Sequence, residues 1–144
     1  MTEEKKIGGV IVSHGKLANE LLSAAETVVG KLEHIQAVSM GWNDDVEIAQ
    51  AEIAKAIKMV SSGVGVLILT DMFGGTPTNI SAMFLKENEV EIVTGVNLPM
   101  VIKVATVNVE IGLRELASEV EETGRSAITR AGSLLSPQKL KKDA

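Results

Sequence analysis

GGVIVSHGKLANELLSAAETVV, residues 8–29, contains the unit from which the fold of this chain is built. Residues 7–13 are rich in β-branched side chains and do not alternate cleanly between polar and apolar positions, a pattern typical of a strand covered on both faces. After His14, apolar residues recur at helical spacing from Leu17 to Val28. The stretch therefore predicts a buried strand followed by a helix.

The same unit recurs along the chain. Further strand-like runs lie at residues 35–40, 64–70 and 90–94, and helical patterns follow Asn43 and Asp44, two good N-cap residues, and begin near Pro77 and near Asn97. Four strand–helix pairs in succession predict a parallel sheet with right-handed crossovers. We therefore expect a single-domain α/β fold, an open, doubly wound, mostly parallel sheet with helices on both faces.

Two segments follow these four units. Residues 109–122 predict a further helix, and residues 126–131, which lie between Gly124 and Gly132, predict a short extra strand. Residues 134–144 predict a surface helix or a frayed tail.

Composition excludes several classes of protein. The 144 residues suit one domain, and a chain with no cysteine and two histidines has neither a disulfide framework nor the ligands of a structural zinc site. We expect no metal and no cofactor. A net charge of -5, with one tryptophan and two phenylalanines, argues against a nucleic-acid partner. The apolar runs have the length of strands, so we expect a cytoplasmic protein with no membrane span.

The polar chemistry lies where strands end. Ligands of open α/β sheets bind beyond the carboxyl ends of the strands, and here the first strand ends in SHG, residues 13–15, and the third in TDMFGGTPTN, residues 70–79. The glycines at 74 and 75 allow a tight turn with free amides, Thr76 is a candidate N-cap, and Pro77 is a candidate first helical residue. Such a loop suits an anion such as phosphate.

The histidine gives this loop a possible reaction. If the first and third strands are neighbours, Asp71 can accept a hydrogen bond from one ring nitrogen of His14 and leave the other nitrogen as a nucleophile. The alternative is that His14 is a structural residue whose ring is satisfied. We expect a phosphohistidine site with His14 and Asp71 as its catalytic residues and Gly74, Gly75 and Thr76 as its phosphate-binding residues.

Other residues carry weaker signals. His34 precedes its strand at the end opposite the site and is expected to be a solvated surface residue. Trp42 could contact a partner or form a hydrophobic lid, and Met72 and Phe73 could form an apolar docking rim or anchor the loop in the core. Ser13 adjoins the histidine on an extended chain, where neighbouring side chains point to opposite faces, so a serine-hydrolase pairing is not expected.

The motifs IVSHGKLANELL, LTDMFGGTPTN and GVNLPM, followed by ETGR at residues 122–125, occur here in a specific order. From about Ile7 to Gly132 the chain resembles the mannose-class enzyme IIA of the bacterial phosphoenolpyruvate-dependent sugar phosphotransferase system. This resemblance implies a phosphotransferase in which His14 accepts phosphate from the phosphocarrier protein HPr and passes it to a IIB protein for sugar uptake.

The resemblance also implies roles and partners. Asp71 would orient the ring, and Thr76 with the neighbouring glycine amides would hold the phosphoryl oxygens. Residues 1–132 would form the IIA domain and residues 133–144 a C-terminal helix or tail. Members of the family are homodimers that exchange a C-terminal strand, which here would be residues 126–131. The membrane would be reached only through IIC and IID partners.

Three alternatives remain at this stage. A two-component receiver would carry the phosphate on Asp71, but receivers need an acidic cluster where this chain has His14. A regulatory phosphate-relay or binding module without transport is compatible with the same motifs. A phosphodonor to dihydroxyacetone kinase is a nearer relative, although FGGTPTN followed by GVNLP is more similar to the sugar-transport branch. Phe73 stands where some members of the family carry tryptophan.

Overall fold

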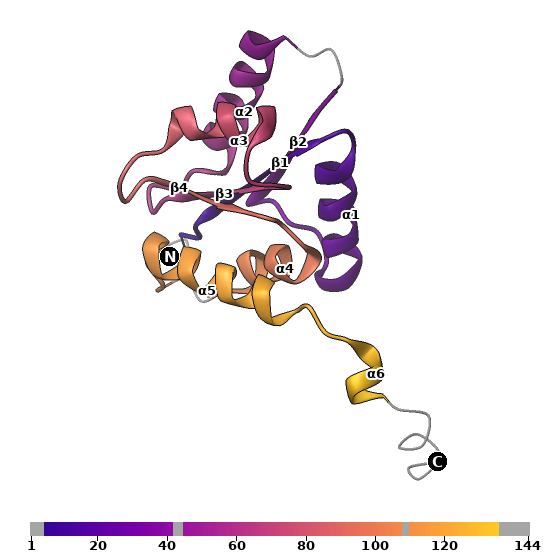
Figure 1. Cartoon of the computed structure of the whole chain (residues 1–144). Helices are drawn as coiled ribbons and strands as arrows, with labels where there is room; N and C mark the ends of the chain where they lie inside the picture. Colours follow the sequence, from indigo (N-terminus) through magenta and orange to yellow (C-terminus); the bar gives the residue numbers. More distant parts are fainter. Residues whose placement is uncertain (1–4, 42–44, 108–109, 136–144) are drawn as a thin grey trace.

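The fold is described from a computed structural model, which describes residues 5–41, 45–107 and 110–135. The elements in chain order are β1 (Gly8–His14), α1 (Leu17–Val29), β2 (Ile35–Met40), α2 (Val46–Val60), β3 (Val66–Thr70), α3 (Gly75–Ser81), the 3-10 turn η1 (Ala82–Phe84), β4 (Val90–Thr94), α4 (Leu98–Thr106), α5 (Leu113–Ser126) and α6 (Ala131–Leu134) (Figure 1). The predicted alternation of strands and helices is confirmed from β1 through α4.

The four strands form one parallel sheet in the order β2-β1-β3-β4. The chain leaves β1 to form β2 on one side and returns to form β3 on the other side. Val12 of β1 lies opposite Thr70 of β3, so these neighbouring strands end at the same edge of the sheet. This position, between β1 and β3, is where the strand order reverses and where open α/β folds bind their ligands.

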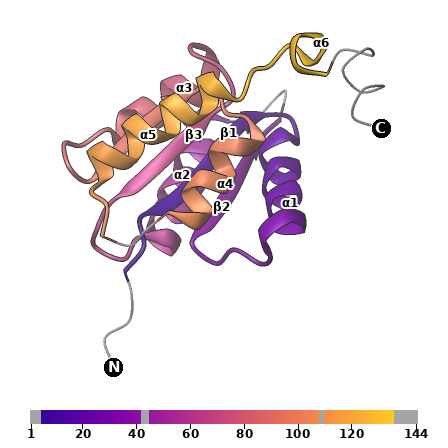
Figure 2. The same ribbon diagram turned by 90° about the horizontal axis from the view of Figure 1, so that it is seen from below.

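Helices cover both faces of the sheet, as Figures 1 and 2 show. On one face, α1, α4 and α5 pack against strand residues that include Ile11 and Leu69. On the other face, α2 and α3 pack against residues that include Val10, Val12 and Ile68. All five residues of β3 are buried, which explains why the run lacks alternation. The predicted doubly wound α/β fold is confirmed.

Two predicted helix boundaries differ in the structure. Asp45 caps α2, with its side chain accepting a hydrogen bond from the amide of Glu47 at 2.8 Å, whereas the predicted caps Asn43 and Asp44 lie outside the described residues. The helix predicted at residues 109–122 begins later, at Leu113, because Gly112 is extended and acts as its N-cap. Within the described ranges, no helix has the length and apolarity needed to cross a membrane.

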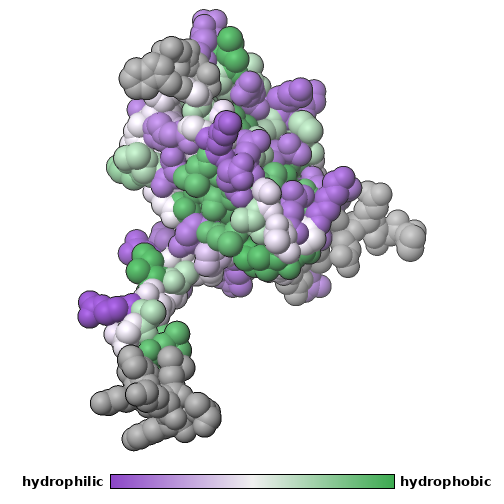
Figure 3. Space-filling view, turned by 90° about the vertical axis from the view of Figure 1, so that its right-hand side faces the viewer, coloured by the Kyte–Doolittle hydropathy of each residue, from purple (hydrophilic) through white to green (hydrophobic). Residues whose placement is uncertain are grey.

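The strand predicted at residues 126–131 is wrong for the single chain. Ser126 is the last residue of α5, and its hydroxyl lies 2.9 Å from a carboxylate oxygen of Glu122, so a contact between residues four apart extends the helix beyond its predicted end. Ala131 then begins α6. The segment from α5 to α6 stands away from the body of the molecule in Figures 1 and 3, so within the chain it has no sheet edge to pair with. Of the predicted C-terminal tail, residues 136–144 lie outside the described residues.

The close packing of β1 against α2 leads to a stability prediction for Gly8. A Cβ atom added at Gly8 would lie 2.5 Å from both the Cγ2 and the carbonyl oxygen of Val60. We expect Gly8→Ala to lower the free energy of unfolding by about 1–3 kcal/mol, because the backbone oxygen cannot rotate away. Chemical denaturation measures this change. Gly132→Ala is the matched control, since nothing lies within 4 Å of its added Cβ; equal stability of the two variants would contradict the prediction.

Candidate functional site

His14 is the last residue of β1, and its side chain is 52% exposed at the carboxyl edge of the sheet. Asp71 directly follows β3 and is 12% exposed. The Nδ1 atom of His14 lies 2.8 Å from Oδ2 of Asp71, and the backbone amide of His14 donates a hydrogen bond to the same oxygen at 3.0 Å. Because β1 and β3 are neighbours, the two residues meet as the sequence analysis required.

The charge of Asp71 determines which ring nitrogen is free. Burial raises the pKa of this carboxyl, but the hydrogen bonds and the charge interaction with His14 outweigh burial, so the pKa of Asp71 lies below its ordinary value of 3.8. The carboxyl is therefore ionised at neutral pH and can only accept hydrogen bonds. An accepting Oδ2 favours the tautomer with the proton on Nδ1 and an unprotonated Nε2.

The glycine turn lies beside this free nitrogen. Gly74 and Gly75 both have positive φ angles, 90° and 81°, which glycine adopts without strain. A Cβ atom added at Gly75 would lie 3.2 Å from Cε1 and 3.3 Å from Nε2 of His14. The absence of a side chain at Gly75 thus leaves open the space that a group bonded to Nε2 would need.

Thr76 is close to its predicted place but does not have its predicted role as a helix cap. The helix α3 begins at Gly75, with Gly74 as its N-cap, so Thr76 is the second helical residue and Pro77 the third. The two positive φ angles turn the chain into the helix two residues earlier than the pattern indicated. Thr76 is exposed in the first turn of α3, directly after Gly75, where an added Cβ atom would contact the His14 ring.

The structure decides whether Ser13 pairs with His14 and whether Met72 and Phe73 anchor the loop in the core. Ser13 is fully buried and its hydroxyl accepts a hydrogen bond from the amide of Ala18 at 2.6 Å. It is therefore not paired with His14, as expected. Met72 is 53% exposed and Phe73 is 84% exposed, so the alternative that they anchor the loop in the core is wrong. Trp42 lies outside the described residues.

The helix α1 also carries exposed apolar residues. Leu17, the first residue of α1, is 46% exposed, and Val28 near its end is 61% exposed. Figure 3 shows apolar surface between polar groups on the side of the molecule that carries α1. A docking rim at the site remains the alternative for Met72 and Phe73 that the structure allows.

Sequence reasoning missed Thr70 and Thr78. Thr70 is fully buried at the end of β3, and Thr78 in α3 is 8% exposed. The hydroxyl of Thr78 lies 2.9 Å from that of Thr70 and 2.6 Å from the carbonyl oxygen of Met72. Two threonines on either side of a glycine turn do not by themselves predict a contact in the sequence. They meet only because α3 packs close to the end of β3.

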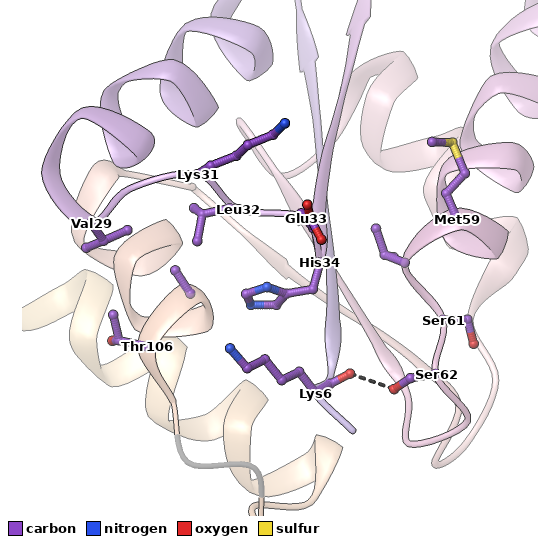
Figure 4. A pocket seen from close by; sticks show the side chains of 12 residues that line it. Lys6, Val29, Lys31, Leu32, Glu33, His34, Met59, Ser61, Ser62 and Thr106 are labelled. Atoms are coloured by element: carbon purple, nitrogen blue, oxygen red, sulfur yellow. Dashed lines mark hydrogen bonds between the residues drawn. The ribbon is translucent and has the colours of Figure 1, made fainter. Parts of the chain in front are cut away.

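The second histidine lies in a hollow at the opposite end of the sheet, shown in Figure 4. This hollow has a volume of about 750 Å³, and Lys6, His34 and Thr106 contribute to its lining. The expectation of a solvated His34 is wrong, because the ring is partly buried and its Nε2 lies 3.5 Å from the carbonyl oxygen of Val104. Burial lowers the pKa of His34, the Val104 carbonyl partly offsets this effect, and the charge of Lys6 lowers the pKa further.

The chain is similar to known proteins over most of its length. The family model described as PTS system fructose IIA component, EIIA-man, matches residues 8–121. The fructose-specific EIIA component of Bacillus subtilis (strain 168) is 28% identical over 116 residues, 80% of each chain. The mannose-specific EIIAB component of Escherichia coli (strain K12) is 32% identical over 126 residues, 83% of this chain and 38% of that protein. The structure of a mannose/sorbose-specific IIA subunit from Enterococcus faecalis is 35% identical, with a TM-score of 0.78, covering 87% of this chain and 94% of that chain.

The environment of His34 predicts a pH dependence of stability. Because its pKa is lower in the folded chain than the ordinary 6.5, the unfolded chain binds the proton first as the pH falls. The stabilising effect of the neutral ring is present above pH 6.5 and is lost as the pH falls toward the folded pKa. Between about pH 7.5 and about pH 5.5, wild type should therefore lose more unfolding free energy than His34→Gln, measured by denaturation at each pH. Parallel pH profiles of the two proteins would contradict this assignment.

Proposed function

The chain belongs to the EIIA-man family of IIA components of the sugar phosphotransferase system (PTS), and we propose that it acts there as a phosphohistidine carrier through His14. It accepts a phosphoryl group from HPr and passes it to a IIB protein for sugar uptake. The observation that carries this proposal is the 2.8 Å contact between Nδ1 of His14 and Oδ2 of Asp71, which leaves Nε2 facing the space beside Gly75.

In the proposed reaction Nε2 is the nucleophile. Its lone pair forms a bond to phosphorus while the bond between phosphorus and the donor breaks, and the donor keeps that electron pair. Positive charge develops on the His14 ring as the new bond forms, and the ionised carboxylate of Asp71 stabilises it through Nδ1. Transfer onward to IIB is the reverse of this step with a different acceptor.

The phosphate-binding residues in this proposal are Gly74, Gly75 and Thr76. The amides of the glycine turn and the Thr76 hydroxyl would donate hydrogen bonds to the phosphoryl oxygens. In support, a Cβ atom added at Gly75 would lie 3.3 Å from Nε2 of His14, and Thr76 is the next residue of α3. Charge on these oxygens is better accommodated by several fixed donors than by water that must reorganise.

The proposed partners are HPr and a IIB protein, with membrane contact only through IIC and IID partners and a cytoplasmic location. The exposed side chains of Met72 and Phe73 provide an apolar rim beside the proposed site for protein docking. The proposal includes a homodimer in which residues 126–131 pair with the sheet of the partner subunit. In its support, Ile128 is 83% exposed and the segment stands clear of its own chain.

The proposed domain is residues 1–132, with residues 133–144 as a helix or tail. The boundary after residue 132 falls inside α6, and all residues of α6 are exposed. The domain limit therefore stays a prediction.

The first test is direct phosphorylation. Wild-type chain incubated with enzyme I, HPr and labelled phosphoenolpyruvate should take up label, His14→Ala should take up none, and His34→Ala should behave as wild type. The label should be lost in acid and retained in alkali, because a phosphohistidine has those properties and an acyl phosphate on Asp71 does not survive alkali. Label in His14→Ala, or its loss from a folded His34→Ala, would overturn the site assignment.

A second test concerns the carboxylate. We expect Asp71→Ala to slow phosphorylation of His14 by about 10²-fold or more while the fold is kept, since the ring loses both its tautomer preference and its charge partner. Asp71→Asn keeps the shape but should also lose much of the rate, because an amide can stabilise the wrong tautomer. Rapid-quench measurement of label uptake gives both rates, and wild-type rates in both variants would assign the carboxylate to another task.

A further inference from the structure

One buried hydroxyl holds both residues that flank Asp71. Thr70 precedes the carboxylate residue and Met72 follows it, and Oγ1 of Thr78 lies 2.9 Å from Oγ1 of Thr70 and 2.6 Å from the carbonyl oxygen of Met72. Thr78 is 8% exposed and Thr70 is fully buried. The backbone that carries Asp71 is therefore held on both sides by a side chain from α3.

The direction of these two hydrogen bonds follows from the number of protons. The Met72 carbonyl can only accept, and a threonine hydroxyl has one proton to donate. Thr78 therefore donates to the carbonyl of Met72, and the hydroxyl of Thr70 donates to Thr78. The result is a directed chain, from the Thr70 hydroxyl through the Thr78 hydroxyl to the Met72 carbonyl, in which each group has one defined role.

The helix that carries Thr78, α3, also carries Gly75, which lies beside the His14 ring. Thr78 lies three residues after Gly75, whose missing Cβ leaves room for Nε2 of His14, while Asp71 holds Nδ1 on the other side of the ring. The hydroxyl of Thr78 thus joins the helix that carries Gly75 to the backbone that carries Asp71. Movement of Gly75 relative to Asp71 would require breaking the hydrogen bonds of Thr78.

We propose that Thr78 is a positioning residue, which holds Asp71 and Gly75 at a fixed separation around the His14 ring so that Nδ1 stays bonded and Nε2 stays free to react. This inference rests on the proposed function, because it assigns Thr78 a part in the same phosphoryl transfer. Thr78 touches neither the ring nor the transferred group in this role. It acts through the carboxylate and the glycine turn.

The hydroxyl, not the volume of the side chain, is what this role requires. Valine has nearly the same shape as threonine, but it would leave the buried Thr70 hydroxyl and the partly buried Met72 carbonyl without their partner. The backbone at Asp71 would then shift to find other donors, and the hydrogen bond from Nδ1 of His14 would weaken. A weaker bond lets the ring populate the tautomer whose Nε2 carries a proton and cannot attack phosphorus.

The experiment compares Thr78→Val with Thr78→Ser in phosphorylation by HPr and in nitrogen NMR of the His14 ring. We expect Thr78→Val to lower kcat by about 10-fold with little change in KM for HPr, because the loss lies in positioning rather than in docking. Its His14 ring should show a mixture of tautomers, where wild type shows the Nδ1-protonated form. Thr78→Ser, which restores the hydroxyl, should recover most of both properties.

The matched control is Thr27→Val. Thr27 is an exposed threonine in α1 whose hydroxyl donates to the carbonyl of Ser23 at 3.0 Å, so the variant also loses a hydroxyl–carbonyl bond, but far from the site. It should keep wild-type kinetics and ring signals. Wild-type ring signals and kcat in a folded Thr78→Val, or failure of Thr78→Ser to recover them, would overturn the role of Thr78. A wild-type chain that takes up no phosphate at His14 would instead overturn the proposed function, and the NMR comparison would still test the positioning of the ring.

Discussion

The hydrogen bond between Nδ1 of His14 and Oδ2 of Asp71 joins the ends of two strands that lie 57 residues apart in the chain. It can form only because β1 and β3 are adjacent, parallel and in register, so that their carboxyl ends meet at one edge of the sheet. The sheet order in turn depends on apolar cores on both faces, which bury β1 and β3 between two helical layers. The position of the exposed His14 ring thus depends on the buried residues of β1 and β3 that precede the site.

The two histidines of the chain show how position in the same sheet changes the character of one residue type. His14 stands at the carboxyl edge with an ionised carboxylate on Nδ1 and an open space beside Nε2. His34 stands at the opposite end, partly buried and near the positive charge of Lys6, so its neutral form is favoured. A ring with an anionic partner stabilises developing positive charge better than a ring near a positive charge does, which is why we propose the reactive role for His14 rather than for His34.

Family membership and site geometry support the proposal in different ways. The similarity to EIIA components covers the four strand–helix units and most of α5, and it identifies the chain as a PTS component. The geometry explains why one histidine could carry a phosphoryl group, through a fixed tautomer, a free nitrogen and a glycine turn beside it. In the proposed role of Thr78, its hydrogen bonds keep these parts in place during phosphoryl transfer.

Sequence alone determined the alternation of strands and helices, because the pattern of buried residues within each element is local and follows strand or helix geometry. It also identified His14, Asp71 and the glycine turn, since polar residues at the ends of apolar runs are visible in one dimension. Only the tertiary structure decided that β1 and β3 are neighbours, that Thr78 reaches across the turn, and that His34 is partly buried. It also moved the start of α3 to Gly75 and extended α5 through residue 126. These features depend on contacts between residues distant in the chain and on backbone angles at single glycines, and neither leaves a periodic trace in the sequence.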